Sequence, residues 1–171
     1  MSVDSKMVHR FYEISRKGQF AMLLDISTPK PGNVHRYQDH SDTRFIHFVA
    51  SITQLGCPLY SAARWGYQQS CTDETPSKLG ELLKTSVQAS MAPHGKNTLL
   101  GTILLLVPLA VAAGSEAAKS HCTPKSLHES LATILHQTSV DDAIELTRAL
   151  KIASPGGAIP NTPEWTPRSQ T

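Results

Sequence analysis

The stretch that decides the fold reads LLGTILLLVPLAVAA, from Leu99 to Ala113, and it is the longest apolar run in the chain. A membrane-spanning helix needs about 20 consecutive apolar residues. This run is shorter and is interrupted by Gly101, Thr102 and Pro108. We therefore expect a helix buried in a protein core, and no membrane partner.

Amphipathic helical patterns lie on both sides of this run. Residues 43–55 place five apolar side chains on one helical face: Phe45, Phe48, Val49, Ile52 and Leu55. Asp42 or Thr43 can cap the start of that helix. An N-terminal helix is predicted from about residue 6 to 27.

Capping signals predict further helices. Thr75-Pro76 and Thr123-Pro124 each pair a capping side chain with a proline suited to a first helical turn. They predict helices over 75–91 and after Thr123. Ser139 followed by Asp142 predicts another, ending near Ile152. Connections are expected near 56–58, 71–76, 92–97, 114–124 and 137–139. No alternating β pattern appears, so we expect an all-α, single multi-helix domain with six or seven helices.

Composition narrows the function classes. The chain has 171 residues, which fits one domain, and a net charge of +2, which is too mild to indicate nucleic acid. The three cysteines, Cys57, Cys71 and Cys122, lack metal-ligand spacing, so zinc is not expected. We expect them to fill small apolar spaces. Their odd number and the absence of an apolar leader favour a cytoplasmic location.

The segment TPKPGNVHRYQDHSD, residues 28–42, has a different character. Pro29 and Pro31 exclude a regular helix, and Gly32 permits unusual backbone angles. Long loops in helical domains are often functional. This loop is either a solvated connection or a site, and its density of polar groups favours a site: Lys30, Asn33, His35, Arg36, Asp39, His40 and Asp42.

Two further junctions are candidates. In APHGKNTLLG, residues 92–101, a helix N-terminus beside Lys96 and His94 could bind an anion such as phosphate, although Asn97 or Thr98 could simply cap the helix. After the last helix, Pro155-Gly156-Gly157 permits close backbone approach to a ligand or merely ends the helix.

These motifs together resemble the triphosphoribosyl-dephospho-CoA synthase family over about residues 15–159. The resemblance rests on Lys-Pro-Gly-Asn-Val at 30–34 with His40-x-Asp42, Asn-Thr-x-x-Gly at 97–101, and Asp142-Ala143 with Gly156-Gly157. Leu99-Leu100 replaces the His-Lys of the citrate-lyase branch, so the chain is more similar to the archaeal-like branch. An all-α fold is implied.

The resemblance also implies a reaction. The 2′-hydroxyl of 3′-dephospho-CoA attacks the anomeric carbon of ATP, adenine leaves, and the triphosphate is retained. Asp42, Asp39 and His40 would be catalytic, and Asp42 and Asp39 would hold Mg²⁺. The implied nucleotide- and phosphate-binding residues are Lys30, Gly32, Asn33, Arg36, Lys96, Asn97, Thr98, Gly101, Gly156 and Gly157.

Family members continue past the Pro-Gly-Gly turn, whereas this chain turns into the proline-rich NTPEWTPRSQT. We therefore expect a helical domain over 1–159, shortened at its C-terminus, and an irregular tail over 160–171. One alternative is a truncated, non-catalytic helical protein that retains at most nucleotide binding. Another is a relative that acts on a different phosphoribosyl substrate, as in a methanopterin-type cofactor pathway. An incomplete domain would expose apolar surface, which favours a homo-oligomer.

Overall fold

The structure, a computed structural model, describes residues 4–72, 77–119 and 122–154, and every regular element in those ranges is a helix. The all-α prediction is therefore confirmed. The helices are α1 (Ser5–Ser27), α2 (Phe45–Gln54), α3 (Gly56–Ser70), α4 (Leu79–Met91), α5 (Leu100–Ser115), α6 (Pro124–His136) and α7 (Val140–Ala153).

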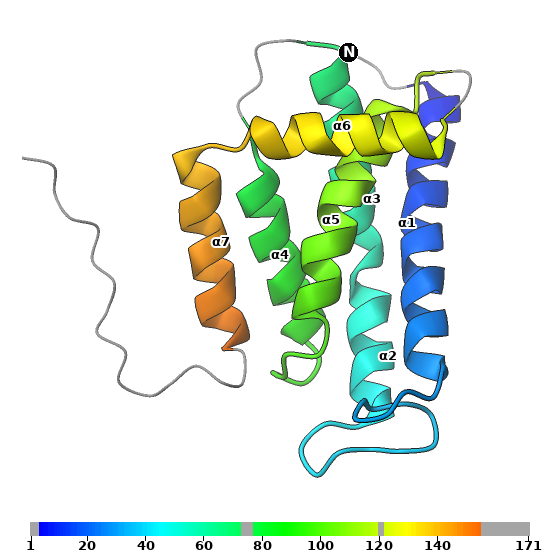
Figure 1. Cartoon of the computed structure of the whole chain (residues 1–171), viewed down its shortest axis with the longest axis vertical. Coiled ribbons are helices and arrows are strands. Elements are labelled where there is room, and N and C mark those ends of the chain that lie inside the picture. The colour runs from blue at the N-terminus through cyan, green and yellow to red at the C-terminus, as the bar shows by residue number, and fades with distance from the viewer. Residues whose placement is uncertain (1–3, 73–76, 120–121, 155–171) are drawn as a thin grey trace, which may run out of the picture.

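Figure 1 shows α1, the α2–α3 column, α4, α5 and α7 running side by side, with α6 crossing them at one end. The apolar run of the sequence forms α5, which packs against α1, α3, α4 and α6. Its central place follows from its composition, because a helix that is apolar all round is stable only when several neighbours cover it.

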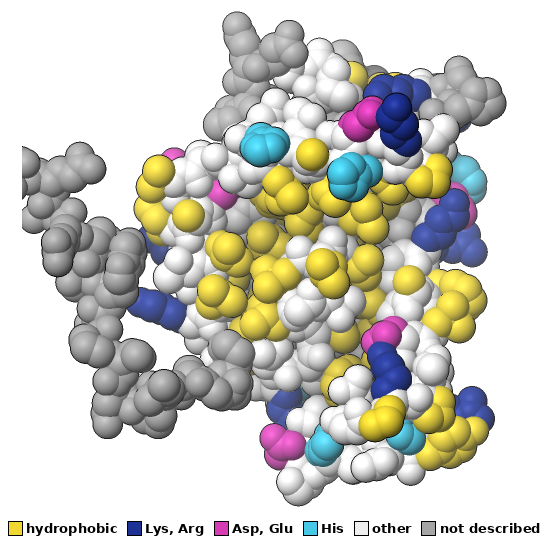
Figure 2. Space-filling view, in the orientation of Figure 1, with side chains coloured by type: hydrophobic (Ala, Val, Ile, Leu, Met, Phe, Trp, Pro, Cys, Tyr) yellow, Lys and Arg dark blue, Asp and Glu magenta, His cyan; other side chains and the backbone are white. Residues whose placement is uncertain are grey.

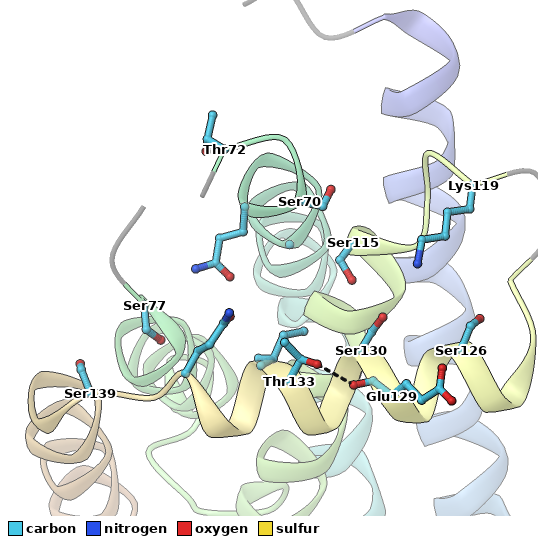
Figure 3. A pocket seen from close by; sticks show the side chains of 14 residues that line it. Ser70, Thr72, Ser77, Ser115, Lys119, Ser126, Glu129, Ser130, Thr133 and Ser139 are labelled. Carbon is cyan, nitrogen blue, oxygen red and sulfur yellow. Dashed lines mark hydrogen bonds between the residues drawn. The ribbon is translucent and has the colours of Figure 1, made fainter. Parts of the chain in front are cut away.

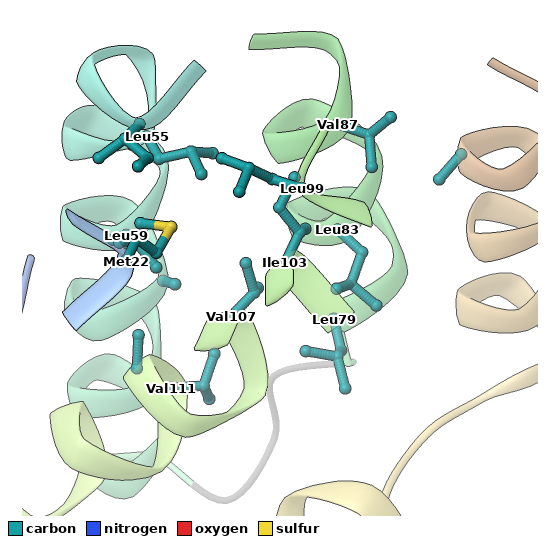
Figure 4. Packing of buried hydrophobic residues seen from close by; sticks show 14 of the residues in the cluster. Met22, Leu55, Leu59, Leu79, Leu83, Val87, Leu99, Ile103, Val107 and Val111 are labelled. Carbon is teal, nitrogen blue, oxygen red and sulfur yellow. The ribbon is translucent and has the colours of Figure 1, made fainter. Parts of the chain in front are cut away.

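The core joins residues of α5 to the helices on either side (Figure 4). Ile103, Val107 and Val111 of α5 are each at most 1% exposed. Leu59 of α3 and Leu83 of α4 lie in the same cluster. Burying a side chain of this kind stabilises the fold by about 1.5–3 kcal/mol, so α5 contributes a large share of the core.

Two glycines set the separation of α3 and α5. A Cβ atom on Gly66 would fall on the backbone of Val111, and one on Gly114 would fall on the backbone of Ala63. The two helices therefore approach backbone to backbone, which only a residue without a side chain permits.

Two of the predicted caps are confirmed. Thr123 accepts a hydrogen bond from the backbone N–H of Ser126 at 3.1 Å. Ser139 accepts one from Asp142 N–H at 3.2 Å, and the Asp142 carboxylate accepts one from Ser139 N–H at 2.9 Å. These reciprocal bonds satisfy amides that a helix start leaves unpaired.

Three predicted boundaries are wrong. α4 begins at Leu79, because residues 77 and 78 are not helical, and Thr75-Pro76 lies outside the described residues. The break expected at 56–58 is a single residue, Leu55, since Pro58 is tolerated in the first turn of α3. Neither Asp42 nor Thr43 caps α2; Arg44 is its N-cap residue, and Asp39 accepts from Phe45 N–H at 2.7 Å.

The three cysteines also differ from expectation. Cys57, Cys71 and Cys122 are all exposed, so they do not fill core spaces. Cys57 lies on the outer face of the first turn of α3, and Cys71 is the residue that ends α3. The exposure of all three departs from the usual preference of cysteine for burial.

Apolar side chains also reach the surface. Leu105 of α5 is 74% exposed and Leu135 of α6 is 49% exposed. Figure 2 shows yellow side chains gathered over the face that α5 and α6 form. This surface agrees with the expected exposure, and the homo-oligomer stays a prediction. Within the described residues, no helix combines the length and apolar character that a bilayer crossing requires.

Candidate functional site

The polar segment 28–44 folds as a turned loop between α1 and α2. Asn33 N–H donates to the carbonyl of Lys30 at 3.2 Å, and Gly32 has a φ of +78°. Across the loop, His40 Nε2 lies 3.2 Å from the Gly32 carbonyl oxygen and is placed to donate to it. The proline–glycine turn therefore holds the start and the end of the loop together.

One pocket of about 370 Å³ unites this loop with the N-terminal end of α5. Figure 1 shows the loop and the α4–α5 connection at the same end of the bundle, opposite α6. Seven residues that the motifs predicted line this pocket: Lys30, Gly32, Asn33, His40, Asp42, Asn97 and Thr98. We call it the motif pocket.

Of the charged side chains that line the motif pocket, two form an ion pair with each other and one has no described partner. Lys30 Nζ lies 2.5 Å from Asp25 Oδ1, and both residues line the pocket. Asp42 has no hydrogen bond or ion pair with any other described residue. An exposed carboxylate that lines the pocket and has no described partner can meet a cation or a developing positive charge. Asp25 has no motif signal, and sequence reasoning missed it.

A buried hydrogen-bonded network lies behind Thr98. Ser51 Oγ of α2 is 2.7 Å from Thr98 Oγ1 and 3.0 Å from His94 Nε2. Ser51 is fully buried, and the rings of His94 and His47 lie with centroids 5.0 Å apart. Sequence reasoning missed this role of Ser51, which appears in the sequence only as a polar residue within an apolar helix face.

The pKa of His47 lies below its usual value. Burial of the ring is the largest cause. Repulsion from His94 in its protonated form and from Arg44 and Lys96 adds to it, and the charge of Asp39 opposes it. His47 Nδ1 accepts a hydrogen bond from Arg44 N–H at 3.1 Å, which also requires that nitrogen to be unprotonated.

Comparison with models of known protein families gives a match over most of the chain. The family model of CitG, ATP:dephospho-CoA triphosphoribosyl transferase, matches residues 11–169, nearly the whole chain. The chain belongs to this family. No curated protein and no solved structure matches it. The match runs through residues 160–169, beyond the range over which the motifs resemble the family.

Not every residue that the family resemblance nominated lies in the motif pocket. Asp39 accepts a hydrogen bond from Phe45 N–H, and Arg36 stacks over the Tyr37 ring at 4.4 Å. Both residues line a neighbouring surface hollow. Lys96 and Gly101 also do not line the motif pocket. Gly156 and Gly157 lie outside the described residues.

The two predicted magnesium ligands are therefore separated in function. Asp42 lines the motif pocket, whereas Asp39 Oδ1 accepts a hydrogen bond from the first backbone N–H of α2. In the part of the chain that the structure describes, no three His, Cys, Asp or Glu side chains gather as a set of metal ligands. A magnesium site here would need oxygen ligands from the substrate phosphates beside Asp42.

The aspartate of the family's third motif has a structural role. Asp142 of α7 is buried and accepts a hydrogen bond from Gly80 N–H of α4 at 2.8 Å. Burial alone would raise the pKa of Asp142, but the hydrogen bonds from Gly80, Ser77 and Ser139 lower it overall. This ionised carboxylate joins α7 to α4 rather than facing the motif pocket.

A larger pocket of about 700 Å³ lies at the opposite end, between α3 and α6 (Figure 3). Hydroxyl side chains line much of it, including Ser70, Ser115 and Ser130, with Lys119 at its edge. None of the residues nominated by the motifs lines it. Its size therefore does not make it the better candidate, because the residues that the family motifs nominated line the motif pocket instead.

Proposed function

We propose that this chain transfers the triphosphoribosyl group of ATP to the ribose 2′-hydroxyl of 3′-dephospho-CoA and releases adenine. One observation supports this most: residues of two motifs, about sixty positions apart in the chain, line a single pocket in a member of this transferase family. The motif pocket is the proposed site.

The reaction breaks the bond between adenine and the anomeric carbon of ATP and forms a bond from that carbon to the acceptor oxygen. The sugar gains positive charge on the way, which a nearby carboxylate stabilises. Asp42 is the proposed carboxylate because it has no other described partner. His40 Nε2 is directed to the Gly32 carbonyl, which leaves Nδ1 to exchange a proton with adenine or the acceptor hydroxyl.

The triphosphate needs positive charge. Lys30 is a cation that lines the pocket, and Thr102 of the first turn of α5 also lines it, so the N-terminus of that helix, whose dipole favours anions, lies at the pocket. Mg²⁺ commonly uses one or two carboxylates together with substrate phosphates. Asp42 fits that requirement, and the metal would neutralise phosphate charge when bound.

The deciding experiment measures adenine release from ATP with 3′-dephospho-CoA and Mg²⁺. Transfer of the triphosphoribosyl group to the acceptor supports the proposal. ATP binding without transfer favours either a non-catalytic nucleotide-binding protein or a different phosphoribosyl acceptor, and a panel of acceptors separates these two. No calorimetric binding at millimolar ATP contradicts the proposal.

Replacing Asp42 tests its role. Asp42→Ala is expected to abolish adenine release while changing the free energy of unfolding by less than about 0.5 kcal/mol, because the side chain is exposed and unpaired. Circular dichroism and urea unfolding check the fold. Asp141→Ala, which removes an exposed carboxylate of α7, is the matched control and is expected to keep activity. Full activity in Asp42→Ala removes this residue from the mechanism.

A further inference from the structure

The network behind Thr98 contains fewer donor hydrogens than acceptor atoms. The donor and the acceptor of each hydrogen bond can therefore be deduced. Its members are the imidazole of His94, the hydroxyls of Ser51 and Thr98, and the carbonyls of His47 and Ser90. A serine hydroxyl has one donor, and a neutral imidazole has one donor and one acceptor.

His94 is fixed first. Its Nδ1 accepts a hydrogen bond from the backbone N–H of Lys96 at 3.1 Å, so Nδ1 carries no hydrogen. The ring hydrogen is therefore on Nε2. It points to the His47 carbonyl oxygen at 2.9 Å and to Ser51 Oγ at 3.0 Å, and both groups accept from it.

The hydroxyl hydrogen of Ser51 also has a defined acceptor. Ser51 Oγ donates to the Ser90 carbonyl at 2.7 Å. That carbonyl lies in the last turn of α4, where Pro93 has no N–H and the N–H of His94 donates to Met91 at 3.2 Å. Ser90 is 2% exposed, and a buried carbonyl without a donor is costly. Ser51 is thus an acceptor for every other partner.

Thr98 must then donate its single hydrogen to Ser51 Oγ, at 2.7 Å. Toward the motif pocket Thr98 offers only oxygen lone pairs. Its neighbour Asn97 is the reverse, because Asn97 Oδ1 accepts from Leu100 N–H at 3.3 Å and the amide hydrogens are left to donate. One acceptor and one donor therefore stand side by side in the pocket wall.

We propose that Ser51 and His94 are positioning residues that hold Thr98 as an acceptor, and that Thr98 with Asn97 recognises a sugar hydroxyl of the nucleotide. A hydroxyl can donate to Thr98 and accept from Asn97 at once. A phosphate oxygen only accepts, so it suits Lys30 rather than Thr98. This inference rests on the proposed function, since it assigns a nucleotide to the motif pocket.

The test compares the binding of ATP, 2′-deoxy-ATP and 3′-deoxy-ATP by calorimetry in the presence of Mg²⁺. We expect ATP to bind about threefold to tenfold more tightly than at least one deoxy analogue. Thr98→Val is expected to abolish this preference, and Thr98→Ser to keep it. Ser51→Ala is expected to reduce the preference although Ser51 does not line the pocket, because Thr98 loses the acceptor for its hydrogen.

Ser86→Ala is the matched control. Ser86 is as buried as Ser51, but its hydroxyl donates to Leu82 within α4, so the preference for ATP should not change. Absence of ATP binding by the unaltered chain contradicts the proposed function. Equal binding of ATP and both analogues, or an unchanged preference in folded Thr98→Val or Ser51→Ala, overturns the inference alone. Thermal unfolding establishes that each variant is folded.

Discussion

The helix bundle and the loop end of the molecule both depend on glycine, but for opposite reasons. The loop end comprises the 28–44 loop and the α4–α5 connection, residues 92–99. In the bundle, Gly66 and Gly114 have normal helical backbones and no space for a side chain. At the loop end, Gly32 and Gly95 have φ values of +78° and +68° and open space around them. In the bundle, close packing restricts which residues are tolerated at these positions. At the loop end, the positive φ of the backbone restricts them.

This difference indicates where stability and function reside. Close packing makes the bundle intolerant of added volume. The loop end keeps Asp42 without a described partner and exposes most of its polar side chains, so little stability depends on them. Substitutions in the two regions should therefore separate loss of fold from loss of ligand binding.

The largest effect is expected from Gly114→Ala. The added methyl group meets the backbone of Ala63, so α3 and α5 must move apart, and unfolding free energy should fall by about 3 kcal/mol or more. Gly101→Ala is the control on the same helix. Nothing lies within 4 Å of its Cβ position, so it should gain about 0.5–1 kcal/mol. Urea unfolding measures both, and similar values for the two variants contradict the packing argument.

The next effect is expected from Asp142→Ala. It removes the acceptor for the amides of Gly80 and Ser139, and the buried Gly80 N–H is left unsatisfied. Unfolding free energy should fall by about 2 kcal/mol. Asp141→Ala, on the exposed side of the same turn, should change it by less than about 0.5 kcal/mol. A small effect at Asp142 means that this carboxylate does not join α7 to α4.

Sequence patterns predicted the helices best where the local signal and the packing agree. The caps at Thr123 and Ser139 and the central place of α5 were predictable, because capping atoms are local and α5 is apolar on every side. The start of α4 was not, because Thr75-Pro76 has the local form of a helix start and yet the helix begins at Leu79.

For the site, motifs nominated the pocket but could not assign every residue to it. Asp39 and Asp42 look equivalent in the sequence, yet one caps a helix and the other faces the pocket. Asp25 and Ser51 reach their places only through the packing of α1 and α2, which no local pattern encodes. The same limit applies to Cys57, whose exposure depends on which face of α3 it occupies.

A smaller stability effect is expected from Gly32→Ala. The new side chain has room, but a positive φ costs a non-glycine residue about 1 kcal/mol. ATP binding should weaken as well, because the turn positions Lys30 and the carbonyl that accepts from His40. Gly32→Asn should recover most of the stability, since asparagine tolerates this conformation. Equal stability of the alanine variant and the unaltered chain indicates that the loop adopts another conformation.

The smallest effect is a dependence on pH that His47 contributes. Its pKa is lowered in the folded chain, so the unfolded chain binds the proton more tightly, and the ring contributes full stability only above its usual pKa of 6.5. That contribution is lost as pH falls below 6.5 toward the lowered value.

His47→Gln tests this dependence. The glutamine side chain can still accept a hydrogen bond from Arg44 N–H, as glutamine does at this position of a helix start, but it does not titrate. Thermal unfolding between pH 7 and pH 5, at about half-unit steps around the usual histidine pKa, should therefore show a flatter profile for His47→Gln than for the unaltered chain. Parallel profiles mean that neither burial of the ring nor the charges around it disfavour protonation of His47 in the folded chain.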